Sequence, residues 1–273
     1  MFPRIGIEEK ASQNEIMDSS STRAGMALAY YKTVNYPLSD PGSSASRLLF
    51  DFSIAISCLL RGTANNKILD FACGSGWTTE LLNKLGYDVY AFDSDASAVK
   101  AGRERVRLDK RVDPSRLHFR VGNGHELDFP NEHFGHIFCF DSLHHMADYE
   151  KVFREMHRVL GVGGRAIFVE PGSRHSKSPE TIQFLRDHNK GGDWVEKDVN
   201  LEETFNLARR VGFAEMKIKP FLLPSTVEFS YVDWLHILEN PSGAENLIRE
   251  LRRFAWEDRV IFHMTRVSLG DTT

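Results

Sequence analysis

The sequence has few cysteines, and their spacing carries no site signature. Its 273 residues include 3 cysteines, Cys58, Cys73 and Cys139, which lie far apart without the Cys-x-x-Cys spacing of zinc or redox sites. We therefore expect reduced structural thiols and no metal centre. Cys73 differs from the others because it lies in a glycine-rich turn before a helix, where a thiol pKa can fall.

Runs of like charge and long apolar segments are also absent. The formal net charge is −4, with no run of five like charges, which argues against a nucleic-acid or polybasic membrane surface. The longest apolar stretch, 52–60, is interrupted by serines and falls short of the roughly 18 residues that span a bilayer. The polar first 18 residues lack a signal core. We expect a cytoplasmic protein with a small-molecule substrate and no nucleic-acid or membrane partner, and leave a homodimer open.

Apolar segments alternate with helical segments over most of the chain. Strands are expected at 68–71, 88–92, 117–121, 136–140, 165–169, 215–219 and 259–267, and helices at 46–61, 77–85, 96–109, 149–160 and 201–211. The 161–164 segment is expected to be a turn. Strands that alternate with helices at this spacing predict an α/β fold, a doubly wound and mostly parallel seven-stranded sheet with helices on both faces.

The chain divides into a cap and a main domain. Residues 1–62 are expected to form an N-terminal helical cap or arm before a domain that spans 63–273. Two segments interrupt the alternation of strands and helices, a polar insertion at 171–200 and a helical one at 222–258. Insertions at the carboxyl ends of strands usually line the binding site, so both are expected on the substrate side.

A glycine-rich turn stands between a buried strand and an amphipathic helix in the stretch 67–85, KILDFACGSGWTTELLNKL. Gly74 and Gly76 let the backbone approach a ligand closely, and the start of the next helix favours an anionic group. The turn therefore predicts a nucleotide-like cofactor, with an ordinary tight turn as the alternative. A dinucleotide fingerprint needs a third glycine where Thr79 stands, which disfavours NAD.

The residues of 67–221 resemble the class I family of S-adenosylmethionine-dependent methyltransferases, which has a seven-stranded Rossmann-like sheet. The family signature is an acid and then Gly-x-Gly-x-Gly after the first strand, and DFACGSG is similar to it with Ala72 in place of the first glycine. That replacement fits if φ at Ala72 is negative. Similar segments are VGNGHELDFP after the third strand and HFGHIFCFDSLHHMADYEKVFREMHRVLGVGGRAIFVEPG for the fourth strand, helix and fifth strand.

The resemblance implies S-adenosylmethionine as cofactor and S-adenosylhomocysteine as product. The implied contacts are Asp70, Ala72, Cys73, Gly74 and Gly76 for the methionine end, Asp93 and Ser94 for the ribose, Asn123 and Gly124 for the adenine, and Phe140 and Asp141 beside the methionine moiety. Asp93 would accept hydrogen bonds from the ribose, with a helix N-cap as its alternative role. Asn123 replaces the family's acid, and its amide oxygen would accept from the adenine amino group.

Four polar residues near strand ends are candidates for catalysis: His144, His145, Glu170 and His175. Open α/β sheets bind ligands at the carboxyl ends of their strands, and imidazole titrates near neutral pH. One of the four would serve as general base for a hydroxyl or carbon acid. Positioning of the loop is the alternative role for each residue.

Methyl transfer to a small molecule is therefore expected, with O-methylation first and C- or N-methylation next. The Asn/Asp-Pro-Pro-Tyr motif of enzymes that methylate amino groups of bases or glutamine is absent after the fourth strand, which disfavours that class. An NAD(P)-dependent oxidoreductase, or a non-catalytic cofactor-binding or regulatory subunit of the same fold, is the alternative.

Overall fold

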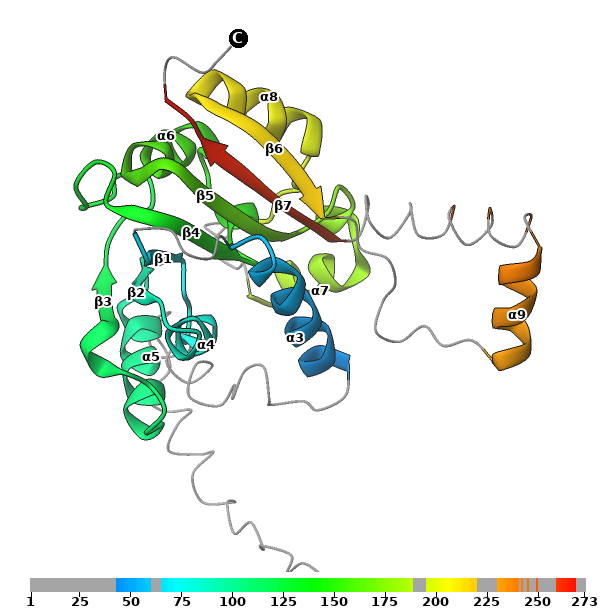
Figure 1. Cartoon of the computed structure of the whole chain (residues 1–273), viewed down its shortest axis with the longest axis horizontal. Helices are drawn as coiled ribbons and strands as arrows, with labels where there is room; N and C mark the ends of the chain where they lie inside the picture. The colour runs from blue at the N-terminus through cyan, green and yellow to red at the C-terminus, as the bar shows by residue number, and fades with distance from the viewer. Residues whose placement is uncertain are drawn as a thin grey trace, which may run out of the picture.

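The computed structural model describes residues 43–59, 65–188, 195–219, 230–240 and 259–268, together with residues 242, 245 and 249. Within these residues the chain forms one seven-stranded sheet with the order β3-β2-β1-β4-β5-β7-β6 (Figure 1). Of the helical cap expected at 1–62, the structure describes α3 (Ser43–Ile56). Residues 1–42 of that expectation lie outside the described residues.

The sheet is mostly parallel, as the sequence predicts. Its strands are β1 (Lys67–Phe71), β2 (Asp88–Asp93), β3 (Leu117–Val121), β4 (Phe134–Phe140), β5 (Leu160–Pro171), β6 (Phe213–Lys219) and β7 (Arg259–Arg266). β1 to β5 pair in parallel, whereas β7 runs antiparallel to both of its neighbours, β5 and β6. The chain runs outward from β1 to β3 and then returns to the other side of β1 as β4. The crevice between the carboxyl ends of β1 and β4 is therefore the topological switch point, where such sheets bind ligands.

Helices cover both faces of the sheet, which confirms that expectation. The helices that the structure describes are α3, α4 (Trp77–Lys84), α5 (Ala96–Leu108), α6 (Tyr149–Val159), α7 (Pro179–His188), α8 (Leu201–Val211) and α9 (Tyr231–Glu239), with 3₁₀ turns η1 (Pro114–Arg116), η2 (Leu143–His145) and η3 (His175–Lys177). Of these, α9 lies away from the sheet (Figure 1). Ile68 of β1 packs in one apolar cluster with Phe52 of α3 and Leu82 of α4. The next residue, Leu69, belongs to the cluster on the other face with Phe153 of α6. This alternation follows from the two-residue repeat of a strand.

Two local expectations are wrong. The segment 161–164, expected to be a turn, is part of β5, which begins directly after α6. Gly164 is required there because a Cβ atom would lie 2.8 Å from the carbonyl oxygen of Gly135. The helix expected at 77–85 ends one residue earlier, at Lys84, so Leu85 lies outside it and is 51% exposed.

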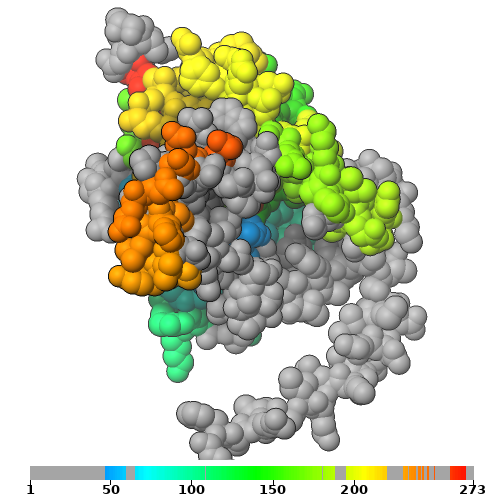
Figure 2. All heavy atoms as spheres, turned by 90° about the vertical axis from the view of Figure 1, so that its right-hand side faces the viewer, coloured from blue at the N-terminus to red at the C-terminus, as the bar shows by residue number. Residues whose placement is uncertain are grey.

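The two insertions lie toward the carboxyl ends of β4 and β5. The first contains η3 and α7, and α9 is the helix described within the second. Figure 2 faces this side of the molecule and shows α7 and α9 there. Within the second insertion the structure describes residues 230–240, 242, 245 and 249, and the others lie outside the described residues. Residues 189–194 of the first insertion also lie outside them. Among the helices that the structure describes, none combines the length and apolarity needed to cross a bilayer.

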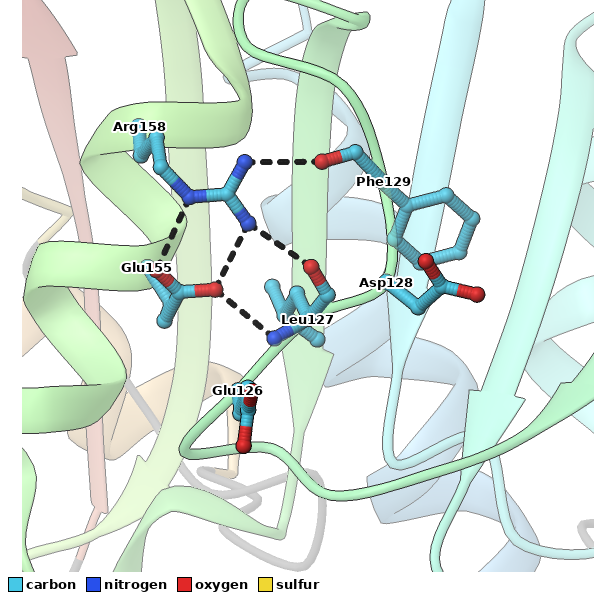
Figure 3. Close-up of a pocket in the computed structure, with 6 residues that line it drawn as sticks. All are labelled: Glu126, Leu127, Asp128, Phe129, Glu155 and Arg158. Carbon is cyan, nitrogen blue, oxygen red and sulfur yellow. Dashed lines mark hydrogen bonds and ion pairs between the residues drawn. The ribbon is translucent and has the colours of Figure 1, made fainter.

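Arg158 fixes the loop before β4 to α6, in a cleft lined by residues of that loop and of the helix (Figure 3). Its guanidinium donates to the carbonyl oxygens of Leu127 and Phe129, both at 2.7 Å. Glu155 accepts from the same guanidinium and from the Leu127 N–H at 2.7 Å. Arg158 and Glu155 therefore act as a structural clamp that holds the loop against α6.

Replacement of Arg158 by methionine is expected to lower the free energy of unfolding by about 2 kcal/mol, because hydrogen bonds of a charged group to backbone carbonyls are lost. Urea denaturation of both proteins measures the change. Arg154→Met is the matched control, since Arg154 pairs with Glu150 on the exposed side of the same helix. That loss is expected to stay below about 0.5 kcal/mol. Equal losses in the two variants would contradict the clamp.

Candidate functional site at the carboxyl edge of the sheet

The turn after β1 has a left-handed backbone at three positions. The φ angles are 56° at Ala72, 51° at Gly74 and 74° at Gly76. The condition that φ at Ala72 be negative is therefore not met, and an alanine in this region is strained by about 1 kcal/mol or more. Gly76 is required twice, since a Cβ atom there would also lie 3.1 Å from Cα of Gly102 in α5. The turn thus brings the start of α4 close to α5.

Asp70 supports this turn from within the protein. Its side chain is 1% exposed, and Oδ2 accepts hydrogen bonds from the hydroxyls of Thr78 at 2.8 Å and Thr79 at 2.5 Å. Thr79, the residue that replaces a dinucleotide glycine, therefore fixes the first turn of α4. Burial raises the pKa of Asp70 to about 6, although both threonine bonds act in the opposite direction. Its contact with the cofactor stays a prediction.

The raised pKa of Asp70 makes its ionisation unfavourable in the folded state. With a pKa of about 6 in the folded chain and 3.8 as the ordinary value, stability is full below pH 4 and falls as pH rises through 6. In Asp70→Asn this loss is absent, so the change in unfolding free energy between pH 4 and pH 7 is expected to differ from that of the parent by roughly 2 kcal/mol. Urea denaturation at both pH values measures it. Parallel pH profiles would contradict the shift.

Asp93 joins the ends of β2 and of the glycine-rich turn. Its Oδ2 accepts from the N–H of Gly74 at 2.8 Å and its Oδ1 from the N–H of Asp95 at 2.9 Å. The N-cap of α5 is Asp95, which accepts from the Ser97 N–H, so the alternative role of Asp93 as helix cap is wrong. Burial raises the pKa of Asp93, and the backbone bonds oppose this rise. Ser94 beside it is exposed.

Cys73 has no sign of an activated thiol. It is 4% exposed, and burial raises its pKa well above the ordinary value, with the charges of Asp70 and Asp93 in the same direction. The expectation that this thiol pKa could fall near the helix start is therefore wrong. Desolvation of the thiolate outweighs the field of the helix.

The two residues expected at the adenine differ in burial: Asn123 is exposed and Gly124 is buried. Asn123 is exposed, and its Oδ1 accepts from the His125 N–H at 2.9 Å and lies 3.0 Å from the ring nitrogen Nδ1. Gly124 is buried against Phe71, whose ring would lie 2.7 Å from a Cβ atom. The amide oxygen of Asn123 thus already has partners within the chain. Its adenine contact, like that of Gly124, stays a prediction.

The loop after β4 begins at Asp141, next to Phe140 at the strand end, and is held by charges from distant segments. Asp141 has a φ of 50° and forms an ion pair with Arg259, which also bonds the buried Asp51 of α3 at 2.7 Å. Burial alone would raise the pKa of Asp141, but Arg259 lowers it to about 2. The Arg259 guanidinium also lies 5.6 Å from the centre of the Phe140 ring. Sequence reasoning missed Arg259 and Asp51, which carry no motif.

A direct contact links this loop to the glycine-rich turn. The hydroxyl of Ser142 bonds the carbonyl oxygens of Ala72 at 3.3 Å and Phe140 at 2.9 Å. The expected methionine-side residues therefore meet across the crevice between β1 and β4.

His144 and Glu170 form a buried pair beside this crevice. Nδ1 of His144 lies 2.8 Å from Oε2 of Glu170, and the side chains are 6% and 0% exposed. Glu170 Oε1 also accepts from the backbone N–H groups of Ser142 at 3.1 Å and Leu143 at 2.8 Å. Burial alone would lower the pKa of His144, but the hydrogen bond and charge of Glu170 raise it overall.

The other two candidate histidines converge with this pair on Glu196, which sequence reasoning missed. Oε2 of Glu196 lies 2.7 Å from Nε2 of His175 and 3.5 Å from Nε2 of His144, and Oε1 lies 3.4 Å from Nδ1 of His145. Burial lowers the pKa of His145, as does the charge of His144. The structure thus brings all four catalytic candidates together. Glu196 has no sequence signal, because it lies in the polar insertion.

The comparisons with known proteins agree with this geometry. Residues 69–168 match the family described as the methyltransferase domain. The chain contains a methyltransferase domain. This match confirms the family that the sequence resembles, and it covers β1 to β5 with the glycine-rich turn, Asp93 and His144.

Two curated relatives of the methyltransferase domain have names that refer to quinones. The chain is 31% identical to the demethylmenaquinone methyltransferase of Listeria welshimeri over 115 residues, which is 41% of this chain and 48% of the relative. It is 33% identical to the ubiquinone/menaquinone biosynthesis C-methyltransferase of Pectobacterium atrosepticum over 121 residues, 43% of this chain and 47% of the relative. The chain thus spans about half the length of these relatives.

Solved structures with this fold cover more of the chain. A phosphoethanolamine N-methyltransferase from Haemonchus contortus in complex with S-adenosylmethionine covers 93% of this chain and 60% of its own, with a TM-score of 0.62 and 18% identity. The geranyl diphosphate C-methyltransferase of Streptomyces coelicolor A3(2) covers 91% and 100%, with a TM-score of 0.61 and 15% identity. At these identities the likeness establishes the Rossmann-like fold of the methyltransferase domain.

Proposed function

We propose that this chain transfers a methyl group from S-adenosylmethionine to a small-molecule acceptor. The observation that carries the proposal is the contact across the switch point between β1 and β4. There Ser142, in the loop that leads to His144 and Glu170, bonds the carbonyl oxygen of Ala72 in the glycine-rich turn. In this proposal the glycine-rich turn is the donor turn, which binds the methyl donor, and the neighbouring histidine–glutamate cluster accepts a proton.

The described residues fit S-adenosylmethionine. Gly74 and Gly76 have positive φ angles, which favour glycine, and because glycine has no side chain the backbone at the start of α4 can approach the methionine end closely. Asp93 presents a carboxylate that the backbone already orients, and each of its oxygens has a lone pair left for a ribose hydroxyl. When bound, the cofactor supplies an electrophilic methyl group.

The cluster of His144, His145, His175, Glu170 and Glu196 is proposed to take up a proton from the acceptor. Methyl transfer is a displacement, so the chain contributes alignment, exclusion of water and a base where the nucleophile must lose a proton. The pairing of Glu170 with Nδ1 of His144 fixes that ring and turns its Nε2 toward Glu196.

Support for the choice of acceptor atom comes from the relatives rather than from the site. The names of the curated relatives favour carbon, in a ring or chain made nucleophilic by a neighbouring hydroxyl that ionises. We therefore place C-methylation first. O-methylation, the first expectation from the sequence, stays a prediction and ranks second, and N-methylation ranks third. Both leading reactions need loss of a proton, which the cluster can accept. The homodimer and the cytoplasmic location also stay predictions.

The other two candidate functions are less well supported. A nicotinamide-dependent oxidoreductase would need a glycine at the position of Thr79, whose hydroxyl instead bonds Asp70. A non-catalytic subunit would have no use for five convergent acid–base groups beside the donor turn. Binding of the cofactor without turnover over a broad acceptor panel would favour that subunit.

Asp93→Ala is expected to weaken S-adenosylhomocysteine binding by more than about tenfold, because charged hydrogen bonds to the ribose are worth roughly 1.5–3 kcal/mol. Titration calorimetry measures the affinity, and circular dichroism checks the fold. Asp88→Ala is the matched control, because Asp88 is an acid at the opposite end of the same strand, where it pairs with His118. Unchanged affinity in folded Asp93→Ala would contradict the ribose assignment, and tight nicotinamide binding without S-adenosylhomocysteine binding would contradict the function.

A further inference from the structure

Three imidazoles surround one carboxylate at the carboxyl edge of the sheet. His144 and His145 come from η2 after β4, His175 from η3 after β5, and Glu196 from the segment before α8. One ligand-type atom each from His144, His145 and Glu196 lies within 4.8 Å of the others. Side chains from the loop after β4 and from two separate parts of the first insertion therefore meet at one point.

The two distances from Glu196 to the histidine nitrogens match the ligand shell of a transition-metal ion. Around a tetrahedral ion with ligands at about 2.0–2.2 Å, neighbouring donor atoms lie about 3.3–3.6 Å apart. The carboxylate oxygens of Glu196 lie 3.5 Å from Nε2 of His144 and 3.4 Å from Nδ1 of His145. A direct hydrogen bond would be shorter than either distance. Nδ1 of His145 also lies 3.0 Å from the carbonyl oxygen of Val195, so binding of an ion there would replace that hydrogen bond and release its proton.

Glu170 gives His144 the tautomer that a metal ligand needs. A carboxylate accepts hydrogen bonds, so Nδ1 of His144, 2.8 Å from Glu170, carries the proton, and the lone pair of the neutral ring is on Nε2. Nε2 is the atom that lies on the Glu196 side. A histidine ligand whose other ring nitrogen donates to a carboxylate is the usual second-shell arrangement. Nε2 of His175 lies 2.7 Å from Oε2 of Glu196, so a hydrogen bond from His175 orients the Glu196 carboxylate.

The two buried carboxylates also favour a divalent cation at this position. Glu170 and Glu196 are 0% and 5% exposed, and a divalent cation would balance both carboxylates while the imidazoles stay neutral. One side of the cluster is open, since the side chains of His145 and His175 are 34% and 22% exposed. Two histidines and one carboxylate with open positions form the ligand set of catalytic zinc and non-haem iron sites.

We propose that His144, His145 and Glu196 bind a divalent transition-metal ion, with Glu170 and His175 as the residues that orient the ligands. This departs from the expectation of no metal, which rested on the cysteine spacing alone. Metal binding itself is independent of the methyltransferase activity. A role for the ion in holding the ionised oxygen of the acceptor rests on the proposed function. Nε2 of His144 accepts a proton only where the ion is absent, because its single lone pair serves one role or the other.

Cobalt(II) titration of the tag-free full chain, treated with chelator and dialysed, tests the proposal through visible absorption and calorimetry. The parent is expected to bind about one ion with the absorption of a site that has nitrogen ligands. Glu196→Gln and His145→Ala are each expected to weaken binding by at least about tenfold, and Glu170→Gln by a similar factor through the second shell.

His118→Ala is the matched control, because it removes a histidine–carboxylate pair, with Asp88, on another strand. It is expected to bind cobalt as the parent does. No saturable binding by the parent, or parent-like affinity in both Glu196→Gln and His145→Ala, would overturn the metal site. Titration of S-adenosylhomocysteine into the same chelated samples tests the proposed function separately, since the donor turn and Asp93 lie outside the ligand set.

Discussion

His144→Ala is expected to lower methyl transfer by at least about 100-fold, the size of a general acid–base contribution, while the affinity for S-adenosylhomocysteine changes less than about twofold. The reason is geometric: His144 lies between two buried carboxylates, and its side chain makes no described contact with the donor turn or Asp93. The measurement is S-adenosylhomocysteine release with a phenol and naphthoquinol acceptor panel, together with calorimetry.

His118→Ala is the control here as well, and it is expected to turn over at the parent rate. His144→Gln, which keeps a hydrogen-bond donor near Glu170, separates loss of chemistry from loss of the loop: its thermal midpoint is expected near the parent value and its turnover near that of His144→Ala. Parent-like turnover in either variant would remove His144 from the reaction.

The elements with local signals could be predicted from the sequence. The helix α8 was predicted at 201–211 and is found at Leu201–Val211. Its start is fixed by Asn200, whose side chain accepts from two backbone N–H groups of the first turn, and its end by Gly212 at a φ of 113°. The seven strands could be predicted for a similar reason, because their apolar runs are bounded by turn residues.

The site could be predicted only where its residues follow strand ends. His144, His145, Glu170 and His175 were candidates because strands of a parallel sheet end at one edge, and the structure brings them together. Glu196 follows no strand and has no motif, and its position depends on the path of the whole insertion. The pKa of Cys73 was predicted in the wrong direction, since burial depends on packing that one turn of sequence does not reveal.

Arg259 shows the same limit, since its partner Asp141 lies 118 positions away in the sequence. Arg259 begins β7, pairs with Asp51 of α3 and Asp141 after β4, and so joins three segments at the carboxyl edge. A single arginine at the start of a strand gives no sign of this role in the sequence. The ion pairs appear only when the antiparallel β7 is inserted beside β5.

Arg259→Met is expected to lower the free energy of unfolding by about 3–5 kcal/mol, because it leaves the buried carboxylate of Asp51 and the partly buried one of Asp141 without their main counter-charge. Asp51 is fully buried, and its remaining described cation, Arg47 at 3.5 Å, has a side chain that is 44% exposed. Urea denaturation measures the loss. Arg111→Met is the matched control, since Arg111 also pairs with an aspartate, Asp109, but is 78% exposed, and its loss is expected below about 1 kcal/mol.

The double variant Asp51→Asn with Arg259→Met distinguishes the charge from the packing of the arginine. If unpaired charge causes the loss, removal of the Asp51 carboxylate restores part of the stability, and the double variant is more stable than Arg259→Met alone. The pH profile gives a second measure. The pKa of Asp141 is about 2 in the folded parent, so its stabilising contribution is present above pH 4 and is lost as pH falls through 2. Without Arg259 this contribution shrinks, and the variant and parent are expected to converge in stability as pH falls below 4.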